Sequence, residues 1–146
     1  MTFSRRVTVT GAAVFALAGA ASVLAPTAAA APPTAAAAYN GACGSGYSVV
    51  NSAPVANEGT VFLTYSPSAR ANCVVTIRNN PGSSRYMSAV LSTGRGADFR
   101  TSRDEGYYTR YAGPVYLTGT SGACVSWFGE IDGQVGGKNN TNCGQN

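Results

Sequence analysis

The chain has 146 residues, with ten basic side chains, six acidic side chains, four cysteines and no histidine. The lack of histidine excludes Ser–His and Cys–His nucleophile pairs and any histidine metal ligand. The basic residues do not cluster among aromatic residues, which argues against a nucleic-acid-binding protein.

The first 31 residues have the pattern of a secretory signal peptide. Arg5 and Arg6 precede an uncharged apolar stretch, and an alanine-rich zone follows it. This order is typical of a cleaved leader and is favoured here over a membrane anchor. Cleavage is expected near residue 31, or as late as residue 38, which leaves a Pro/Ala linker at residues 32–38 and a single secreted β domain at residues 39–146. We therefore expect an extracellular protein with no membrane segment after cleavage.

The mature part holds short runs of valine, tyrosine, threonine and other strand-forming residues, separated by glycine, proline and asparagine. In chain order, the expected strands are residues 47–50, 60–65, 73–78, 85–91, 114–118 and 123–128. The expected turns and loops are residues 51–59, 66–72, 79–82 and 92–106, followed by a polar tail at residues 130–146. No segment has a helical apolar period over three turns. The fold class that follows is all-β, a small antiparallel β sandwich or barrel.

The segment 107–129 is expected to form the core of the domain. Its two apolar runs flank a short Gly/Ser loop, a pattern typical of a β-hairpin. It contains four of the eight tyrosines and the single tryptophan, Trp127, which we expect to point inward close to Cys124. Tyr107, Tyr108 and Tyr111 lie next to the charged segment 92–106, and we expect them to form a candidate binding rim, although packing at the ends of the sandwich is the simpler explanation.

Four cysteines, Cys43, Cys73, Cys124 and Cys143, lie in the mature part. An even number of cysteines in a short secreted domain indicates disulfides, and the lack of a C-x-x-C pair disfavours a zinc site. We favour Cys43–Cys73 with Cys124–Cys143, because Cys124 starts a strand and Cys143 ends the segment that returns beside it. The nested pairing, Cys43–Cys143 with Cys73–Cys124, stays open at this point.

Catalysis would have to rest on carboxylates. Glu130 with Asp104 or Glu105 is the pair that a glycosidase would need across a cleft. Solvated loop charges beside arginines explain these acids more simply, so we assign no catalytic residue and expect a protein that is not an enzyme. No cofactor is expected either.

Residues 79–84 (NNPGSS) resemble the calcium segment of βγ-crystallin domains. Asn79, Asn80, Ser83 and Ser84 would supply the oxygen ligands that calcium prefers. No acidic residue lies within the motif, and an ordinary Asn-Pro-Gly turn is the favoured interpretation. We therefore assign no metal and keep these four residues as a weak calcium candidate.

Four blocks of the mature chain resemble the spore-associated protein family of streptomycetes and related actinobacteria. They are YNGACGSGYSVV at residues 39–50, GTVFLTY at 59–65, NCVVTIRNN at 72–80 and YAGPVYLTGTSGACVSWF at 111–128. The resemblance covers nearly the whole mature domain, whereas segments 94–103 and 133–142 are less typical. It implies an exported protein found with spores or aerial hyphae, and no catalytic motif travels with it.

The function expected from the sequence is therefore that of a secreted spore- or cell-surface-associated structural or binding protein. Its expected partner is a spore or cell-wall surface. One alternative is a βγ-crystallin-like secreted module, such as a killer-toxin-like protein or a protease inhibitor, with calcium binding. Another is a cell-wall carbohydrate-binding module or hydrolase.

Overall fold

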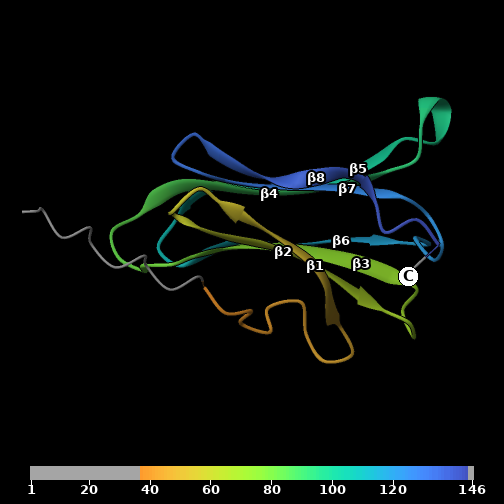
Figure 1. Ribbon diagram of the computed structural model, residues 1–146, viewed down its shortest axis with the longest axis horizontal. Helices are drawn as coiled ribbons and strands as arrows, with labels where there is room; N and C mark the ends of the chain where they lie inside the picture. The colour runs from red at the N-terminus through yellow and green to blue at the C-terminus, as the bar shows by residue number, and fades with distance from the viewer. Residues whose placement is uncertain (1–36, 145–146) are drawn as a thin grey trace, which may run out of the picture. The chain divides into compact units, whose positions relative to one another are not determined.

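Eight strands form two four-stranded antiparallel sheets in the computed structural model, which describes residues 37–144 (Figure 1). The strands are β1 (Ser48–Val55), β2 (Gly59–Ser66), β3 (Ala71–Arg78), β4 (Arg85–Thr93), β5 (Arg100–Tyr108), β6 (Tyr111–Thr118), β7 (Val125–Ile131) and β8 (Gln134–Thr141), with a 3-10 turn, η1 (Gly96–Asp98), between β4 and β5. The all-β prediction is confirmed. The predicted signal peptide and most of the predicted linker lie outside the described residues.

Sheet 1 has the strand order β1-β2-β3-β6, and sheet 2 has the order β5-β4-β7-β8. The two sheets lie one above the other as two layers (Figure 1). Side chains from both sheets share one buried cluster that includes Leu63, Val74, Leu91 and Trp127. In a sandwich of this kind the inner faces of the two sheets interdigitate to make the core.

The predicted hairpin at residues 114–118 and 123–128 is wrong. Those residues fall in β6 and β7, which belong to different sheets: β6 pairs with β3, and β7 pairs with β4. The loop between them crosses one end of the sandwich, where Thr120 N–H donates to the Arg70 carbonyl oxygen at 3.1 Å. A short Gly/Ser loop between two apolar runs is compatible with a hairpin and also with a connection between two sheets. Which of the two forms depends on the strands with which each run pairs, and the local sequence does not show them.

Three segments predicted as loops or tail contain strands. β1 extends to Val55 rather than ending at residue 50, because Ala53 and Val55 are buried against the core. β5 occupies about half of the predicted loop 92–106, and β8 occupies about half of the predicted polar tail 130–146. Both β5 and β8 are edge strands that expose polar side chains, so their sequences lack the apolar runs on which the prediction depended.

The outer face of sheet 1 holds a second buried cluster. Every residue of β2 and β3 is buried, including the outward-facing Phe62, Val75 and Ile77. The segment 37–47 packs over them with Tyr39 and Tyr47, on the far side of sheet 1 from sheet 2 (Figure 1). A strand buried on both faces reads as a continuous apolar run, which explains why these two strands were predicted well.

The structure forms the disulfides Cys43–Cys73 and Cys124–Cys143. This is the local pairing favoured from the sequence. Cys43–Cys73 fastens the segment 37–47 to β3, and Cys124–Cys143 joins the residue before β7 to the residues after β8. Each bond therefore fixes a terminal part of the domain to a strand of the core.

The two sheets are in close contact at Gly129 of β7. A Cβ atom at this position would lie 2.2 Å from Thr76 Oγ1 and 2.9 Å from Val61 Cβ, both in sheet 1. Real Cβ atoms do not come so close, so any side chain here must push the sheets apart.

We expect Gly129→Ala to lower the free energy of unfolding by about 1–3 kcal/mol, the usual cost of overpacking a core. For a domain of this size the loss corresponds to a fall in melting temperature on the order of 5–15 °C. Gly82→Ala is the matched control, because a Cβ at Gly82 meets no atom within 4 Å. Equal melting temperatures for the two variants would show that the sheets are not in close contact at Gly129.

The open edges of the two sheets are joined by hydrogen bonds on both sides of the sandwich. On one side, Asp104 of β5 accepts from Gly113 N–H of β6 at 2.6 Å and from the Tyr108 hydroxyl at 2.6 Å. On the other side, Asn51 of β1 accepts from Lys138 Nζ of β8 at 2.8 Å. The sandwich is therefore fastened along both of its sides.

Candidate binding surfaces

The three tyrosines of the predicted rim do not lie on one face. Tyr107 and Tyr108 are neighbours on β5, so their side chains point to opposite faces of sheet 2. Tyr107 is 75% exposed on the outer face, whereas Tyr108 packs against the core. Tyr111 starts β6 in sheet 1 and lines, with Tyr108 and Arg110, a small cavity of about 330 Å³. Tyr107 is therefore separated from the other two.

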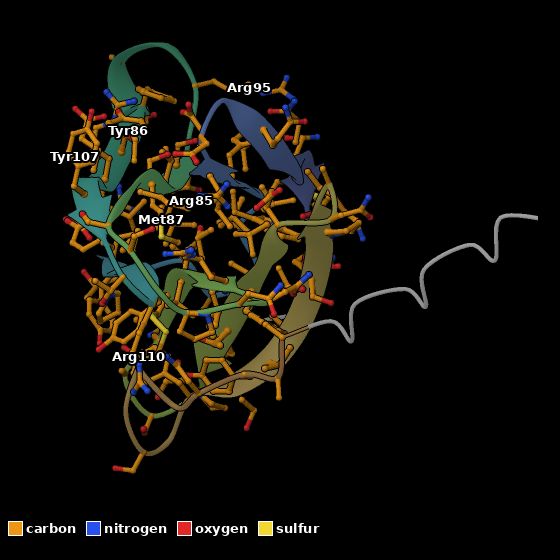
Figure 2. The ribbon with its side chains drawn as sticks, turned by 90° about the vertical axis from the view of Figure 1, so that its left-hand side faces the viewer. Arg85, Tyr86, Met87, Arg95, Tyr107 and Arg110 are labelled. Carbon is orange, nitrogen blue, oxygen red and sulfur yellow. A yellow bond between two sulfur atoms is a disulfide. The ribbon has the colours of Figure 1, made fainter. Side chains whose placement is uncertain are left out.

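Tyr107 instead pairs with Tyr86, a residue that the sequence analysis did not single out. Their ring centroids are 5.9 Å apart with an interplanar angle of 74°, an edge-to-face arrangement. They are direct neighbours in the β4–β5 register, and Figure 2 shows both on the same side of the domain. Because 21 positions separate the two in the chain, only the strand register brings them together.

Carboxylates surround this tyrosine pair. The Tyr86 hydroxyl donates to Glu105 Oε2 at 3.4 Å, and Arg103 Nε lies 3.5 Å from the same oxygen. Partial burial of the hydroxyl, followed by the negative charges of Glu105 and Glu130, raises the pKa of Tyr86 above its ordinary value. The outer face of sheet 2 thus combines the exposed ring of Tyr107 and the half-buried ring of Tyr86 with hydrogen-bond acceptors.

Glu105 and Glu130 lie on opposite sides of Ser88, each in direct register with it. They are two strand spacings apart, roughly 10 Å between Cα atoms. Asp104, the other acid considered from the sequence, faces inward and holds β6 instead. The structure therefore brings Glu130 and Glu105 to one sheet face and places Asp104 elsewhere.

The Tyr108 hydroxyl illustrates how the β5–β6 junction depends on pH. Its hydrogen bond to Asp104 is the main cause that raises the pKa of Tyr108 above the ordinary value of 10.0, with burial adding to the effect. A raised pKa in the folded state means that folding favours the protonated phenol. The stabilisation is complete below pH 10 and is lost as the pH rises through the higher folded value.

We therefore expect melting temperature to fall as the pH rises above about 10, and tyrosinate absorbance to develop later in the folded protein than in the denatured protein. Tyr108→Phe should remove part of the delayed absorbance and flatten the alkaline fall in melting temperature. An unchanged absorbance titration in Tyr108→Phe would contradict a role for this phenol.

The calcium candidate lies in the turn between β3 and β4. Its Asn79 amide is already engaged: the side-chain oxygen accepts from Ala37 N–H at 2.8 Å, and the nitrogen donates to the Asn57 carbonyl at 3.0 Å. The buried Arg78 guanidinium donates to the Ser83 carbonyl at 2.7 Å, so a positive charge already lies against this turn. Asn80 and Ser84 are exposed. In residues 37–144, no three His, Cys, Asp or Glu side chains gather as a metal site would require.

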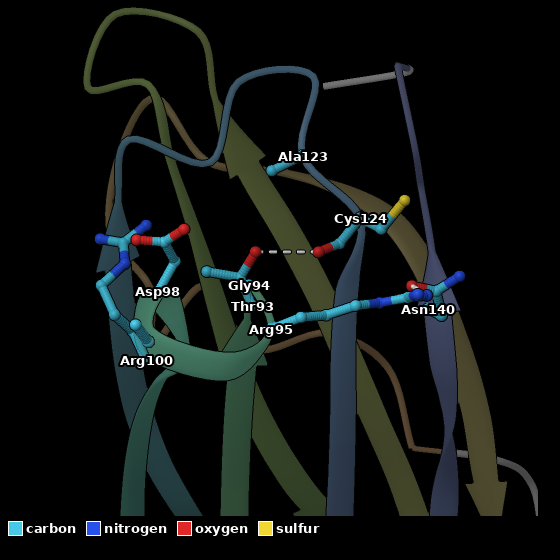
Figure 3. Close-up of a pocket in the computed structure, with 9 residues that line it drawn as sticks. Thr93, Gly94, Arg95, Asp98, Arg100, Ala123, Cys124 and Asn140 are labelled. Atoms are coloured by element: carbon cyan, nitrogen blue, oxygen red, sulfur yellow. Dashed lines mark hydrogen bonds between the residues drawn. The ribbon is translucent and has the colours of Figure 1, made fainter.

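A hollow lies at the end of the sandwich where β4 turns into β5 (Figure 3). Its volume is about 670 Å³. Arg95 reaches toward Asn140 on one side of it, and Asp98 and Arg100 lie on another (Figure 3). The sequence predicts only a charged loop for Arg95, Asp98 and Arg100, and a polar tail for Asn140.

Comparison with known proteins decides the family. The chain is 50% identical over 107 residues to spore-associated protein A of Streptomyces coelicolor, which covers 73% of this chain and 67% of the relative. The chain belongs to the spore-associated protein family. The resemblance inferred from the four sequence blocks is therefore confirmed. No family model matches the chain, and no solved structure matches it.

Within residues 37–144, no helix is long and apolar enough to cross a membrane.

Proposed function

We propose that this protein is exported and acts at the spore or hyphal surface as a structural or binding protein without catalytic activity. The observation that carries the proposal is the 50% identity to a protein named for its association with spores. The signal-peptide pattern of the first 31 residues supports export.

The Tyr86–Tyr107 pair is the surface that we propose makes the contact; Tyr107 is exposed and Tyr86 is half-buried. Its rings stand on a four-stranded sheet, which gives them a fixed backbone position. Aromatic rings with few rotatable bonds lose little conformational entropy when they bind, which makes them effective contact residues. A rigid sheet that presents them is suited to adhesion.

Binding of labelled protein to isolated spore walls and to hyphal walls tests the proposal. We expect the wild-type protein to bind, and the double variant Tyr86→Ala/Tyr107→Ala to bind on the order of tenfold more weakly, which corresponds to about 1.4 kcal/mol. Tyr111→Ala is the matched control, because Tyr111 is also exposed but belongs to sheet 1. Failure of the wild-type protein to bind either wall would overturn the proposal.

A carbohydrate-binding module is the second candidate, and the outer face of sheet 2 favours it. Aromatic rings stack on sugars while nearby carboxylates accept from sugar hydroxyls, and Glu105 supplies such a carboxylate beside Tyr86. Competition by soluble wall sugars would support this candidate. If the protein is instead a hydrolase, the wild type should release new sugar ends from wall material. Glu130→Gln and Glu105→Gln should each abolish that release.

The topology does not single out the βγ-crystallin-like alternative. A Greek key places the fourth strand beside the first, in the order 4-1-2-3, and most β-sandwiches contain one. Here β4, β5 and β6 follow one another and β7 returns beside β4, so the motif is present but is not specific to βγ-crystallins. A rise in melting temperature at millimolar calcium is the result that would revive this alternative.

A further inference from the structure

The hollow beside η1 has the dimensions of a small-molecule site. Its volume of about 670 Å³ lies within the range of about 300–1,000 Å³ that is usual for ligand pockets. It lies between the β4–β5 turn, the residues just before β7, and β8. Its lining residues are Thr93, Gly94, Arg95, Ala97, Asp98, Arg100, Ala123, Cys124 and Asn140.

The walls of this pocket are fixed by the fold. Gly94 has φ +80°, and a Cβ there would lie 2.2 Å from the Asp98 carbonyl oxygen, so the turn closes tightly on itself. The Thr93 hydroxyl donates to the Cys124 carbonyl at 2.8 Å, which joins the end of β4 to the residue before β7 (Figure 3). The disulfide Cys124–Cys143 then ties that residue to the segment after β8. A pocket of this kind is preformed and does not need a ligand to assemble it.

Two arginines give the pocket a positive charge. Arg100 Nη1 donates to the Thr118 carbonyl at 2.9 Å, and Arg95 Nη2 donates to Asn140 Oδ1 at 3.4 Å. Both acceptors are neutral, and in residues 37–144 no carboxylate forms an ion pair with either guanidinium. Each guanidinium has five N–H donors, so most of them remain available to a ligand.

The arginines elsewhere in sheet 2 are neutralised. Arg85 forms ion pairs with Glu58 and with Asp132, and Arg103 forms one with Glu105. Against the two pocket arginines stands a single acid, Asp98. The pocket therefore carries a local excess of positive charge, since its two arginines form no ion pair and face one acid.

We propose that this pocket binds the anionic group, phosphate or carboxylate, of a polyhydroxylated molecule such as an acidic sugar or a polyol phosphate. Guanidinium groups match the geometry of both anions. Asp98 and Asn140 then accept from hydroxyl groups of the same ligand, which a bare inorganic anion lacks. The inference rests on the proposed function in one respect: the natural carrier of this group is a polymer of the spore or hyphal surface.

An NMR titration of the whole mature protein tests the pocket. The probes are glycerol phosphate, glucuronate and glycerol, and binding is followed by the backbone amide chemical shifts. We expect one or both anions to bind and glycerol to fail, with shifts confined to residues 93–100, 118, 123–124 and 140. The stronger of the two anions identifies a phosphate or a carboxylate source. Raising the salt concentration from 0.05 M to 0.5 M should weaken binding severalfold, because exposed charges are screened.

Arg95→Gln and Arg100→Gln should each lower the affinity for the anion at least tenfold and leave the melting temperature unchanged. Arg103→Gln is the matched control, an exposed arginine of β5 whose ion pair lies on the outer face. The inference is overturned if neither anion binds at millimolar concentration, if glycerol binds as well, or if Arg103→Gln has the same effect. Because these probes are small molecules, wall binding by the wild-type protein remains a separate result that judges the proposed function alone.

Discussion

Trp127→Ala should lower the free energy of unfolding by about 3–5 kcal/mol, the largest loss that we expect from any single substitution in this domain. The indole is fully buried at the centre of the inner face of sheet 2. Its ring N–H donates to the Thr141 hydroxyl at 2.9 Å, and Lys138 Nζ lies 5.9 Å from the ring centroid. The substitution therefore opens a cavity and also removes a link between β7 and β8.

Urea denaturation followed by circular dichroism measures this loss, since the variant lacks the tryptophan that fluorescence would use. Trp127→Phe should fall between the wild type and Trp127→Ala, because it keeps part of the ring but loses the hydrogen bond. Tyr107→Ala is the control on the opposite face, where 75% exposure predicts a change within about 0.5 kcal/mol. A loss below 1 kcal/mol for Trp127→Ala would mean that the core is not built around the indole.

The double variant Cys43→Ala/Cys73→Ala should lose about 3–4 kcal/mol of stability, as chain entropy predicts for a loop of 30 residues. It should also uncover the second buried cluster. Phe62, Val75 and Ile77 are shielded by the segment 37–47, and the disulfide is the covalent link that holds that segment in place. We therefore expect the folded variant to bind a hydrophobic dye that the wild type does not bind.

Cys124→Ala/Cys143→Ala is the matched control for this second effect. Its loop of 19 residues predicts a similar entropic loss of about 3 kcal/mol. It lies away from the outer face of sheet 1, so it should bind no more dye than the wild type while folded. Equal dye binding by both double variants would show that the segment 37–47 does not depend on Cys43–Cys73.

The strands that were predicted best are those whose burial can be recognised from their own residues, without knowledge of the neighbouring strands. β2 and β3 are buried on both faces, so apolar residues follow one another directly, as VFL in β2 and CVV in β3. β5 was missed because its inward positions hold Ser102, Asp104 and Gly106. Asp104 can face inward only because it accepts from the backbone N–H of Gly113 on β6, a partner that no local pattern reveals.

The candidate surfaces were predicted least well, for the same reason. Tyr86 and Tyr107 become neighbours through the register of β4 and β5, and Arg95 reaches Asn140 across 45 positions of chain. Tyr107, Tyr108 and Tyr111 looked like one group because they are close in sequence. On a strand, closeness in sequence places consecutive side chains on opposite faces, so the predicted rim divides.

The hydrogen bonds that fasten β5 to β6 and β1 to β8 have a consequence for assembly. An unprotected edge strand offers its backbone to a neighbouring molecule and permits growth into cross-β fibres. Here Asp104 and Asn51 hold the edges of the two sheets against each other. These contacts hold each edge strand against the opposite sheet of the same molecule, which hinders edge-to-edge growth of copies of this protein into an amyloid film.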